Sequence, residues 1–369
     1  MVSHLLHTEG KRILIKGNQA IAQAAINAGV ECYFGYPITP QSEIGEYLSI
    51  KLPEMGLTFI PAESELASIN MLIGASTVGV KAMTSSSSCG IALMQEAISA
   101  MCCQQIPGVI ISVMRGGPGL GNIAPAQGDY FQATKGGGNG DYKTIVLSPS
   151  TIQEAIDLTY KAFYLTFKYR NPVMLLADGI LGQMMEPVYF NKYPYSGIES
   201  DVSSWALSGA KNREARNLVS LHMDNLDMTH ISNKIFKKYK EFQEKEMMYE
   251  SFMIEDADII ISAFGIVGRI AKAAVTKARQ NGIKVGLFRP IVLSPFPEEI
   301  LHKLTKNAKV ILDIEMNQGQ MLYDVRSAVF GNAPVEFYGK AAGDIISDDD
   351  VYEKIIEIDK KYVHKAFSK

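Results

Sequence analysis

Short apolar runs alternate with helical patterns along most of the chain. In the first half, apolar runs that stop at glycine, proline or serine predict buried strands, and the segments between them carry apolar residues at helical spacing. The predicted strands are 31–36, 57–60, 81–85, 109–114, 144–147 and 173–177, and the predicted helices are 17–29, 63–77, 91–103 and 151–167. This alternation is typical of a parallel sheet with helices on both faces.

A second block of the same kind begins near residue 256. It predicts strands at 258–263, 283–288 and 309–315, with helices ending near Arg279 and Phe330. Between the blocks the pattern breaks; this segment contains the single tryptophan, Trp205, and a mixed-charge stretch at 234–246 that predicts a solvated helix between domains.

We therefore predict an α/β fold with two doubly wound parallel-sheet domains. Their predicted bounds are 1–188 and 251–369, with a partly helical linker at 189–250.

Composition narrows the class of protein. The chain has 369 residues, is 47% hydrophobic and 20% charged, and has a net charge of −3, which describes a soluble globular protein without a basic footprint for nucleic acid. No signal-peptide pattern and no membrane-length apolar run occurs, so we expect no membrane association and a cytoplasmic location.

The four cysteines are Cys32, Cys89, Cys102 and Cys103. They lack the spacing of a zinc site, so we predict buried reduced thiols. Any redox metal centre would therefore belong to another chain.

A glycine-rich segment marks the first candidate site. Arg115 directly follows the predicted strand 109–114 and opens a run, continuing to residue 142, that is unusually rich in glycine. Glycine lets the backbone approach another group closely, and an arginine at the carboxyl end of a buried strand lies where open α/β sheets bind ligands. The alternative is a flexible surface lid with an incidental arginine.

Two acidic residues open a predicted helix after the second strand. Glu65 shares a helix face with Ile69 and Leu72, whereas Glu63 points to another side. A carboxylate on a buried face is costly unless it is hydrogen-bonded, so Glu65 is a candidate functional residue. The alternative is the general preference of acidic residues for helix N-termini, which explains Glu63 better than Glu65.

Three shorter motifs leave structural alternatives open. Residues 36–40, Tyr-Pro-Ile-Thr-Pro, form a rigid shelf after a strand with Thr39 as the hydroxyl between two prolines, which fits a site or a structural turn equally. Gly265 and Gly268 match a dinucleotide-binding turn only loosely, so a tight strand-to-helix turn is favoured. Asp178, within Ala-Asp-Gly, is interpreted as a structural residue at a strand end.

Taken together, these segments resemble the alpha subunit of 2-oxoacid:ferredoxin oxidoreductases. The resemblance covers nearly the whole chain in order and is weakest at about 191–250; the run 115–141 is most similar to the branched-chain (3-methyl-2-oxobutanoate, or 2-ketoisovalerate) type. The segments that carry it are 36–40, 63–65, 84–90, 115–119, 127–130, 289–290, 295–297 and 315–320.

The resemblance implies a thiamine diphosphate enzyme, with a pyrimidine-binding-like domain and a transketolase-C-terminal-like domain. Glu65 would accept a hydrogen bond from the cofactor's pyrimidine ring, and Pro37 and Ser88 would help to bind the cofactor. Arg115 would bind the substrate carboxylate, and Thr39 would hydrogen-bond the substrate near its keto oxygen. The reaction would be oxidative decarboxylation of a branched-chain 2-oxo acid to an acyl-CoA, with reduction of ferredoxin.

The resemblance also implies partners. The chain lacks the full Gly-Asp-Gly and asparagine motif that holds diphosphate through Mg²⁺, and the family places both groups on a beta subunit. It further implies a gamma subunit, a ferredoxin-like delta subunit, [4Fe–4S] clusters on the partners, coenzyme A as co-substrate, and ferredoxin as acceptor. The alternatives are the same chemistry on 2-oxoglutarate or another 2-oxo acid, and a non-catalytic scaffold subunit; a non-oxidative decarboxylase would need the missing motif on this chain.

Overall fold

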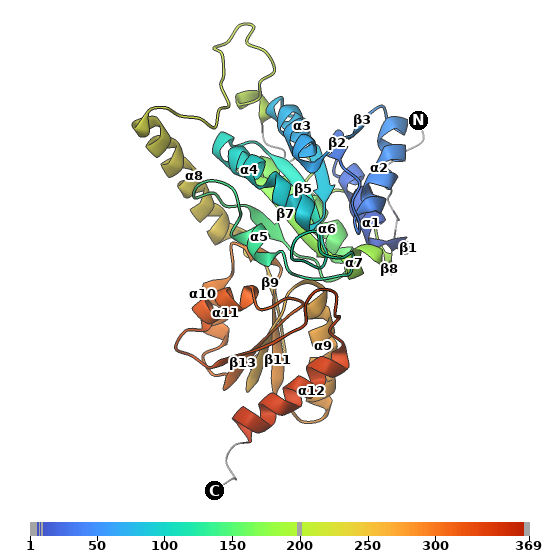
Figure 1. Ribbon diagram of the computed structural model, residues 1–369, viewed down its shortest axis with the longest axis vertical. Helices are drawn as coiled ribbons and strands as arrows, with labels where there is room; N and C mark the ends of the chain where they lie inside the picture. The colour runs from blue at the N-terminus through green and yellow to red at the C-terminus, as the bar shows by residue number, and fades with distance from the viewer. Residues whose placement is uncertain (1–5, 7, 9, 198–200, 365–369) are drawn as a thin grey trace.

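Two sheets, one above the other in Figure 1, organise the molecule. The computed structural model describes residues 6, 8, 10–197 and 201–364. The remaining positions are 1–5, 7, 9, 198–200 and 365–369. The predictions for these parts of the two domains and of the linker lie outside the described residues.

The larger sheet has seven strands and is parallel except for one edge. Its strand order is β12-β6-β7-β5-β4-β2-β3, in which β12 runs antiparallel to β6. The strands are β2 (Cys32–Gly35), β3 (Thr58–Pro61), β4 (Ala82–Ser86), β5 (Gly108–Met114), β6 (Ile145–Leu147), β7 (Pro172–Asp178) and β12 (Val292–Ser294).

Helices cover both faces of this sheet because its strands are apolar on both sides. In β5, Val109, Ile111 and Val113 join one core cluster, and Ile110 and Met114 join the other, as the two-residue period of a strand requires. The first cluster contains residues of α1 (Gly17–Asn27), α2 (Ser42–Glu54) and α6 (Ile152–Tyr169); the second contains residues of α3 (Glu65–Thr77) and α4 (Ser88–Gln104).

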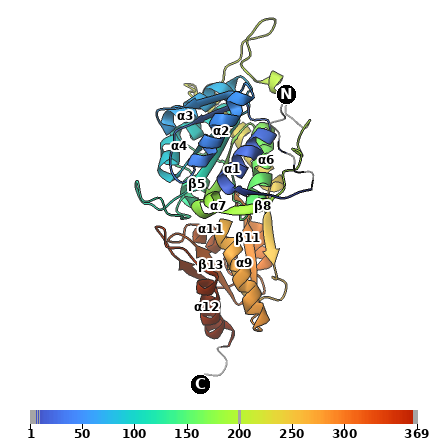
Figure 2. The ribbon, with the colours of Figure 1, turned by 90° about the vertical axis from the view of Figure 1, so that its right-hand side faces the viewer.

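The smaller sheet has five strands in the order β14-β13-β10-β11-β9. Its strands are β9 (Tyr249–Phe252), which is antiparallel, β10 (Ile259–Ser262), β11 (Val285–Pro290), β13 (Val310–Glu315) and β14 (Val335–Gly339). Its helices are α9 (Gly265–Gln280), α10 (Glu298–Leu304), α11 (Met321–Val329) and α12 (Asp348–Ile358). Figure 2 shows α9 and α12 below the first unit, on the far side from α3 and α4.

The sequence patterns predicted most strands of the two sheets, and the two α/β units are confirmed. The helices α2 and α12 and the edge strand β14 were not predicted. Three features differ from two purely parallel sheets. β9 and β12 run antiparallel, and β12, although it follows β11 in sequence, joins the first sheet beside β6. The segments β1 (Ile13–Lys16) and β8 (Met185–Val188) form a separate antiparallel pair. The domain bounds of 188 and 251 stay a prediction.

The linker helix is longer and more embedded than the charge pattern predicted. α8 (Asn225–Lys245) begins nine residues before the predicted start, and Asp224 caps it by accepting hydrogen bonds from two backbone N–H groups. Ile235, Tyr239 and Phe242 are buried at helical spacing, so the helix is a surface element with one packed face rather than a fully solvated one.

Short elements complete the described chain. They are α5 (Tyr130–Thr134), α7 (Gly179–Gln183), the 3₁₀ turn Val202–Ser204 and the π turn Asp359–Val363. No described helix is both long and apolar enough to cross a membrane.

The cysteine prediction needs correction. All four thiols are free, but Cys102 alone is buried and the other three are half-buried.

Candidate active site at the carboxyl edge of the seven-stranded sheet

The candidate residues gather at the carboxyl edge of the seven-stranded sheet. β3 lies on one side of β2 and β4 on the other, so the chain changes direction at β2. In open α/β sheets a ligand crevice forms at the carboxyl ends of strands at such a switch point. The Thr39 shelf follows β2, Ser88 follows β4 and Arg115 follows β5, which places all three at this edge.

Glu65 is the first residue of α3, and its side chain is turned into the protein. It is 5% exposed, and Ile69 and Leu72 on the same face are fully buried, as the spacing predicted. Ser64, not Glu63, caps the helix by accepting a hydrogen bond from the Ala67 N–H. Glu63 therefore lies before the helix and is exposed, which corrects the predicted helix start.

The Glu65 carboxylate contacts the first turn of α4. Ser86 Oγ donates a hydrogen bond of 3.2 Å to Glu65 Oε1. A Cβ atom at Gly90 would lie 2.3 Å from Glu65 Oε1 and 2.1 Å from Ser86 Oγ, so this contact requires glycine. The N-terminal end of a helix carries partial positive charge, which favours a carboxylate beside it.

Arg115 is 6% exposed and ties two segments of this edge together. Its Nη1 donates to the Thr39 carbonyl at 3.0 Å, and its Nη2 donates to the Leu120 carbonyl at 2.8 Å and to Cys89 Sγ at 3.1 Å. Its Nε is buried without a hydrogen-bond partner in the described chain. The guanidinium is therefore positioned by backbone groups and keeps one buried donor unused.

Ser88 and Asp129 form a second pair beside Arg115. Ser88 Oγ donates to Asp129 Oδ2 at 2.5 Å and accepts a hydrogen bond from the Arg115 backbone N–H at 3.0 Å. Burial raises the pKa of Asp129 from 3.8 to about 6, although the Ser88 hydrogen bond and the Arg115 charge oppose the rise. Asp129 lies in the Gln-Gly-Asp-Tyr motif at 127–130, but the sequence does not predict its role because its proximity to Ser88 depends on the path of the loop.

Thr39 and Pro37 lie on the outer side of the same edge. Both are exposed, and within the described residues the Thr39 hydroxyl makes no hydrogen bond. Pro37 lines a pocket of about 280 Å³ with Tyr33, Tyr36 and Phe59. Glu65 does not line this pocket. Hydrogen bonds join Arg115 to the Thr39 carbonyl and to Ser88, so the structure links these three predicted residues directly.

The smaller unit closes one side of this region. The contacts join the motif at 127–130 to the motif at 315–320, which are far apart in sequence. The Gln127 side chain donates to the Phe264 carbonyl and accepts from the Met316 N–H, and Asn317 Nδ2 donates to the Gln127 carbonyl. Further along the loop, Asn122 Nδ2 donates to the Ala342 carbonyl at 2.8 Å. The glycine-rich segment is thus held against the smaller unit along much of its length.

Two of the structural interpretations are confirmed. The Asp178 carboxylate caps α7 by accepting from the Ile180 and Leu181 N–H groups, both at 3.0 Å. Gly265 has a φ of +54° and starts α9 directly after β10, so it forms a strand-to-helix turn.

These residues fit the pyrimidine half of a thiamine cofactor. Glu65 is a buried carboxylate that accepts a hydrogen bond from one serine hydroxyl within the described residues, so it keeps acceptor capacity for a ring N–H donor. Asp178 commits its carboxylate to a helix cap and offers no comparable arrangement for a diphosphate.

The sequence matches known families over most of its length. Residues 23–253 match the family described as pyruvate flavodoxin/ferredoxin oxidoreductase, thiamine diP-binding, and residues 257–351 match the pyruvate:ferredoxin oxidoreductase core domain II. The chain is 45% identical over 346 residues to the ketoisovalerate oxidoreductase subunit VorB of Methanothermobacter marburgensis, covering 94% of this chain and 97% of the relative. It is 33% identical over 369 residues to the 2-oxoglutarate synthase subunit KorA of the same organism, covering 93% and 98%.

Solved structures agree with this assignment. The 2-oxoglutarate:ferredoxin oxidoreductase from Magnetococcus marinus, solved with 2-oxoglutarate, coenzyme A and succinyl-CoA bound, superposes with a TM-score of 0.84 at 26% identity. The match covers 94% of this chain and 65% of that one. A split-gene transketolase, at 13% identity and a TM-score of 0.58, shares the fold. The chain belongs to the 2-oxoacid:ferredoxin oxidoreductase family, as one subunit of a multi-subunit oxidoreductase.

Proposed function

We propose that this subunit holds the aminopyrimidine of thiamine diphosphate and the 2-oxo acid carboxylate in an enzyme that converts 3-methyl-2-oxobutanoate to its acyl-CoA and reduces ferredoxin. The observation that carries the proposal is Glu65, a carboxylate buried at a helix start and accommodated by Gly90. A scaffold subunit has no need of a buried carboxylate at that position, because burial without a functional partner is costly.

The residues of this chain have separate tasks in the proposal. Thiamine diphosphate, when bound, supplies the carbanion chemistry at the keto carbon. Glu65 accepts the pyrimidine N–H hydrogen bond, and Ser86 fixes the orientation of the carboxylate. Arg115 donates a hydrogen bond from its unused Nε to the substrate carboxylate, and the Thr39 hydroxyl donates a hydrogen bond to the keto oxygen. Ser88 acts by positioning Arg115 through its backbone, and Pro37 forms part of the cofactor-side wall.

The choice of a branched-chain substrate rests on the loop that follows Arg115. Residues 116–132 contain no Arg, Lys or His, and Leu120 and Ile123 are 77% and 66% exposed. A 2-oxoglutarate site needs a cation for the distal carboxylate, because an unpaired buried carboxylate is prohibitive. The relative with 45% identity is named for ketoisovalerate, whereas the 2-oxoglutarate relatives are less similar.

The remaining requirements are assigned to partners. A beta subunit supplies the diphosphate and Mg²⁺ site, and gamma and delta subunits supply [4Fe–4S] clusters and transfer electrons to ferredoxin. Coenzyme A enters as co-substrate. The exposed Leu120 and Ile123 support an interface at the glycine-rich loop, since exposed apolar groups in one patch mark association sites.

The test is kcat/KM of the enzyme co-purified with its native partners on 3-methyl-2-oxobutanoate, pyruvate and 2-oxoglutarate. We expect 3-methyl-2-oxobutanoate to be preferred, with residual use of close relatives because one methylene changes the transition-state free energy by only about 1–3 kcal/mol. Preference for 2-oxoglutarate would reject the substrate while leaving the thiamine role intact; absence of all three activities in an assembled, cofactor-loaded complex would favour the scaffold alternative.

A further inference from the structure

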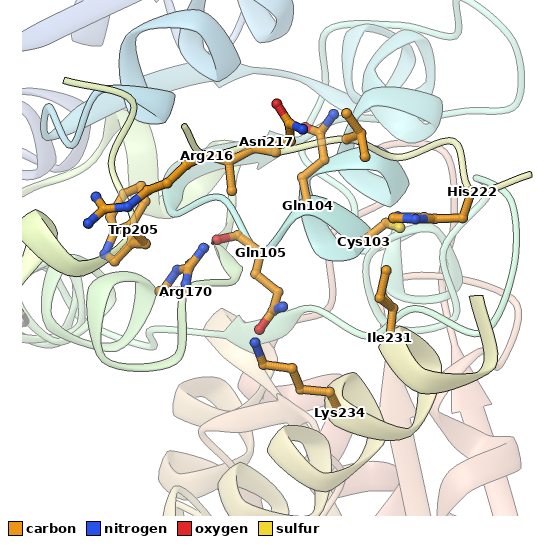
Figure 3. Close-up of a pocket in the computed structure, with 12 residues that line it drawn as sticks. Cys103, Gln104, Gln105, Arg170, Trp205, Arg216, Asn217, His222, Ile231 and Lys234 are labelled. Carbon is orange, nitrogen blue, oxygen red and sulfur yellow. Dashed lines mark hydrogen bonds between the residues drawn. The ribbon is translucent and has the colours of Figure 1, made fainter. Parts of the chain in front are cut away.

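A pocket of about 300 Å³ lies at the opposite, amino edge of the seven-stranded sheet (Figure 3). It is enclosed by the ends of α4 and α6, the segment before α8, and α8 itself. Gln105 lines it just before β5, whereas Arg115 follows β5. The seven residues of β5 separate the two regions by roughly 20 Å at about 3.3 Å per residue. This pocket is therefore distinct from the candidate active site.

The pocket is positively charged. Arg170, Arg216 and Lys234 line it together with His222, and no aspartate or glutamate is among its lining residues. This local excess of positive charge occurs in a chain whose net charge is −3, so composition does not explain it.

The two guanidinium groups are held in place by backbone carbonyls. Arg170 Nε donates to the Gln105 carbonyl at 3.2 Å, and Arg216 Nη1 donates to the Ala206 carbonyl at 3.1 Å. Within the described residues neither group forms an ion pair closer than 4 Å, although Asp201 interacts with Arg216 at longer range. Each guanidinium has five N–H donors, so most of the donors on each have no protein acceptor within the described residues.

Helix ends explain only part of this arrangement. Arg170 is the cap residue of α6, and a cation is favourable at the C-terminal end of a helix. Arg216 comes from an irregular segment and Lys234 from within α8, so neither is placed by a helix terminus. Burial lowers the pKa of neighbouring Lys238 to about 8, and the nearby charges of Arg170 and Lys234 act in the same direction.

Polar atoms without partners line the same pocket. Trp205 Nε1, His222 Nε2 and Gln104 Oε1 are buried and lack a hydrogen-bond partner in the described chain. Trp205 is 5% exposed and stacks with Arg170, whose Cζ lies 4.7 Å from the ring centroid. Figure 3 shows Arg170 and Arg216 at the Trp205 end and His222 and Ile231 at the other, with Lys234 between. Buried polar atoms without protein partners are rare in folded proteins, and here they lie beside cationic side chains in one pocket.

We propose that this pocket binds a small phosphorylated molecule through its phosphate. A phosphate monoester carries close to two negative charges and three acceptor oxygens, so it suits a pocket lined by two arginines and a lysine better than a single carboxylate does. The volume lies at the small end of ligand pockets, and Leu218 and Ile231 provide an apolar wall for a compact organic part. The proposal does not depend on the proposed function.

The single tryptophan makes a direct test possible. The full chain is titrated with inorganic phosphate and with AMP at constant ionic strength while Trp205 fluorescence is recorded. We expect a saturable change for both, and tighter binding of AMP than of phosphate identifies the organic ester as the ligand class, whereas equal affinity identifies free phosphate. No saturable change below about 10 mM of either anion would overturn the proposal, because that corresponds to weaker than about 3 kcal/mol of binding.

Matched variants separate the pocket from general charge. Arg216→Gln and Lys234→Gln should each weaken binding by about tenfold or more, while Lys211→Gln, an exposed residue on the same segment but outside the pocket lining, should change it by less than about twofold. Equal weakening by Lys211→Gln would reject the site. Lys234 is exposed, so its variant remains informative if the Arg216 variant does not fold. Calorimetry on the assembled enzyme completes the test: loss of binding there would show that a partner subunit covers the pocket, which rejects the proposal.

Discussion

The carboxyl and amino edges of the seven-stranded sheet hold opposite kinds of polar site. At the carboxyl edge, charged groups have partners: Ser86 bonds to Glu65, Ser88 bonds to Asp129, and Arg115 is held by carbonyls on two segments. At the amino edge, cations from three segments meet without a carboxylate among the lining residues.

The two edges differ in how far their residues could be identified from the sequence. The carboxyl edge is assembled from turns that directly follow strands, so each of its residues belongs to a short motif rich in glycine, serine or proline. The amino edge depends on where the irregular segment before α8 lies. Figures 1 and 2 show that segment at the end of the molecule far from the smaller unit.

The strongest test of the carboxyl edge is Glu65→Gln. We expect kcat of the assembled enzyme to fall by about 10²–10⁴-fold, the range lost with a general acid–base group, because the amide is a poorer acceptor and cannot carry the charge. Glu63→Gln is the matched control, since Glu63 is exposed and lies before the helix, and it should change kcat by less than about threefold. The measurement is steady-state turnover with thiamine diphosphate saturating; similar losses at both positions would contradict the assignment.

Arg115→Lys tests whether this edge recognises the substrate by geometry or by charge alone. Lysine keeps the charge but loses the planar fork that reaches the Thr39 and Leu120 carbonyls together, so we expect kcat/KM to fall about 10–100-fold for every 2-oxo acid. Arg269→Lys, at an exposed ion pair with Glu186, is the control. A fall confined to one substrate would argue against a role at the shared carboxylate.

At the carboxyl edge, we expect the contribution of Asp129 to lower the free energy of unfolding as pH rises. The pKa of Asp129 is about 6 in the folded chain and 3.8 ordinarily. Between these values only the unfolded chain ionises, so the contribution of Asp129 makes stability fall as pH rises through this window. Asp129→Asn should remove this loss, on the order of 1–3 kcal/mol, in urea unfolding at pH 4 and pH 7. Asp141→Asn, an exposed residue, should leave the pH profile unchanged.

The amino edge should show the opposite sign. The pKa of Lys238 is about 8 when folded and 10.5 ordinarily, so its contribution makes stability rise as pH increases from 8 to 10.5. Lys238→Met removes this cost but also removes the hydrogen bond that Lys238 Nζ donates to the Arg170 carbonyl, so we expect a net stabilisation of only about 1 kcal/mol at pH 7 and less above pH 9. Lys240→Met on the exposed face of α8 is the control, and equal stabilisation by both would remove the contrast between the edges.

Local chemistry made much of this protein predictable from sequence. Runs such as 109–114 are apolar throughout, which identifies a strand buried on both faces, and the four-residue and seven-residue spacing of Glu65 to Ile69 and Leu72 placed the carboxylate on the buried face of α3. The turn at Gly265 and the cap at Asp178 followed from backbone requirements that act within a few residues.

Tertiary structure decided what depends on contacts between distant segments. β12 joins the first sheet by pairing with β6, which lies about 145 residues earlier in the chain. No local pattern specifies a pairing between such distant segments. The same holds for the Ser88–Asp129 hydrogen bond, for the contacts of Gln127 with Phe264 and Met316, and for the cations brought around Trp205. Periodicity shows which side of an element is buried, but it carries no information about the group packed against that side. Many elements and their buried faces could therefore be predicted from the sequence, whereas the sites required the fold.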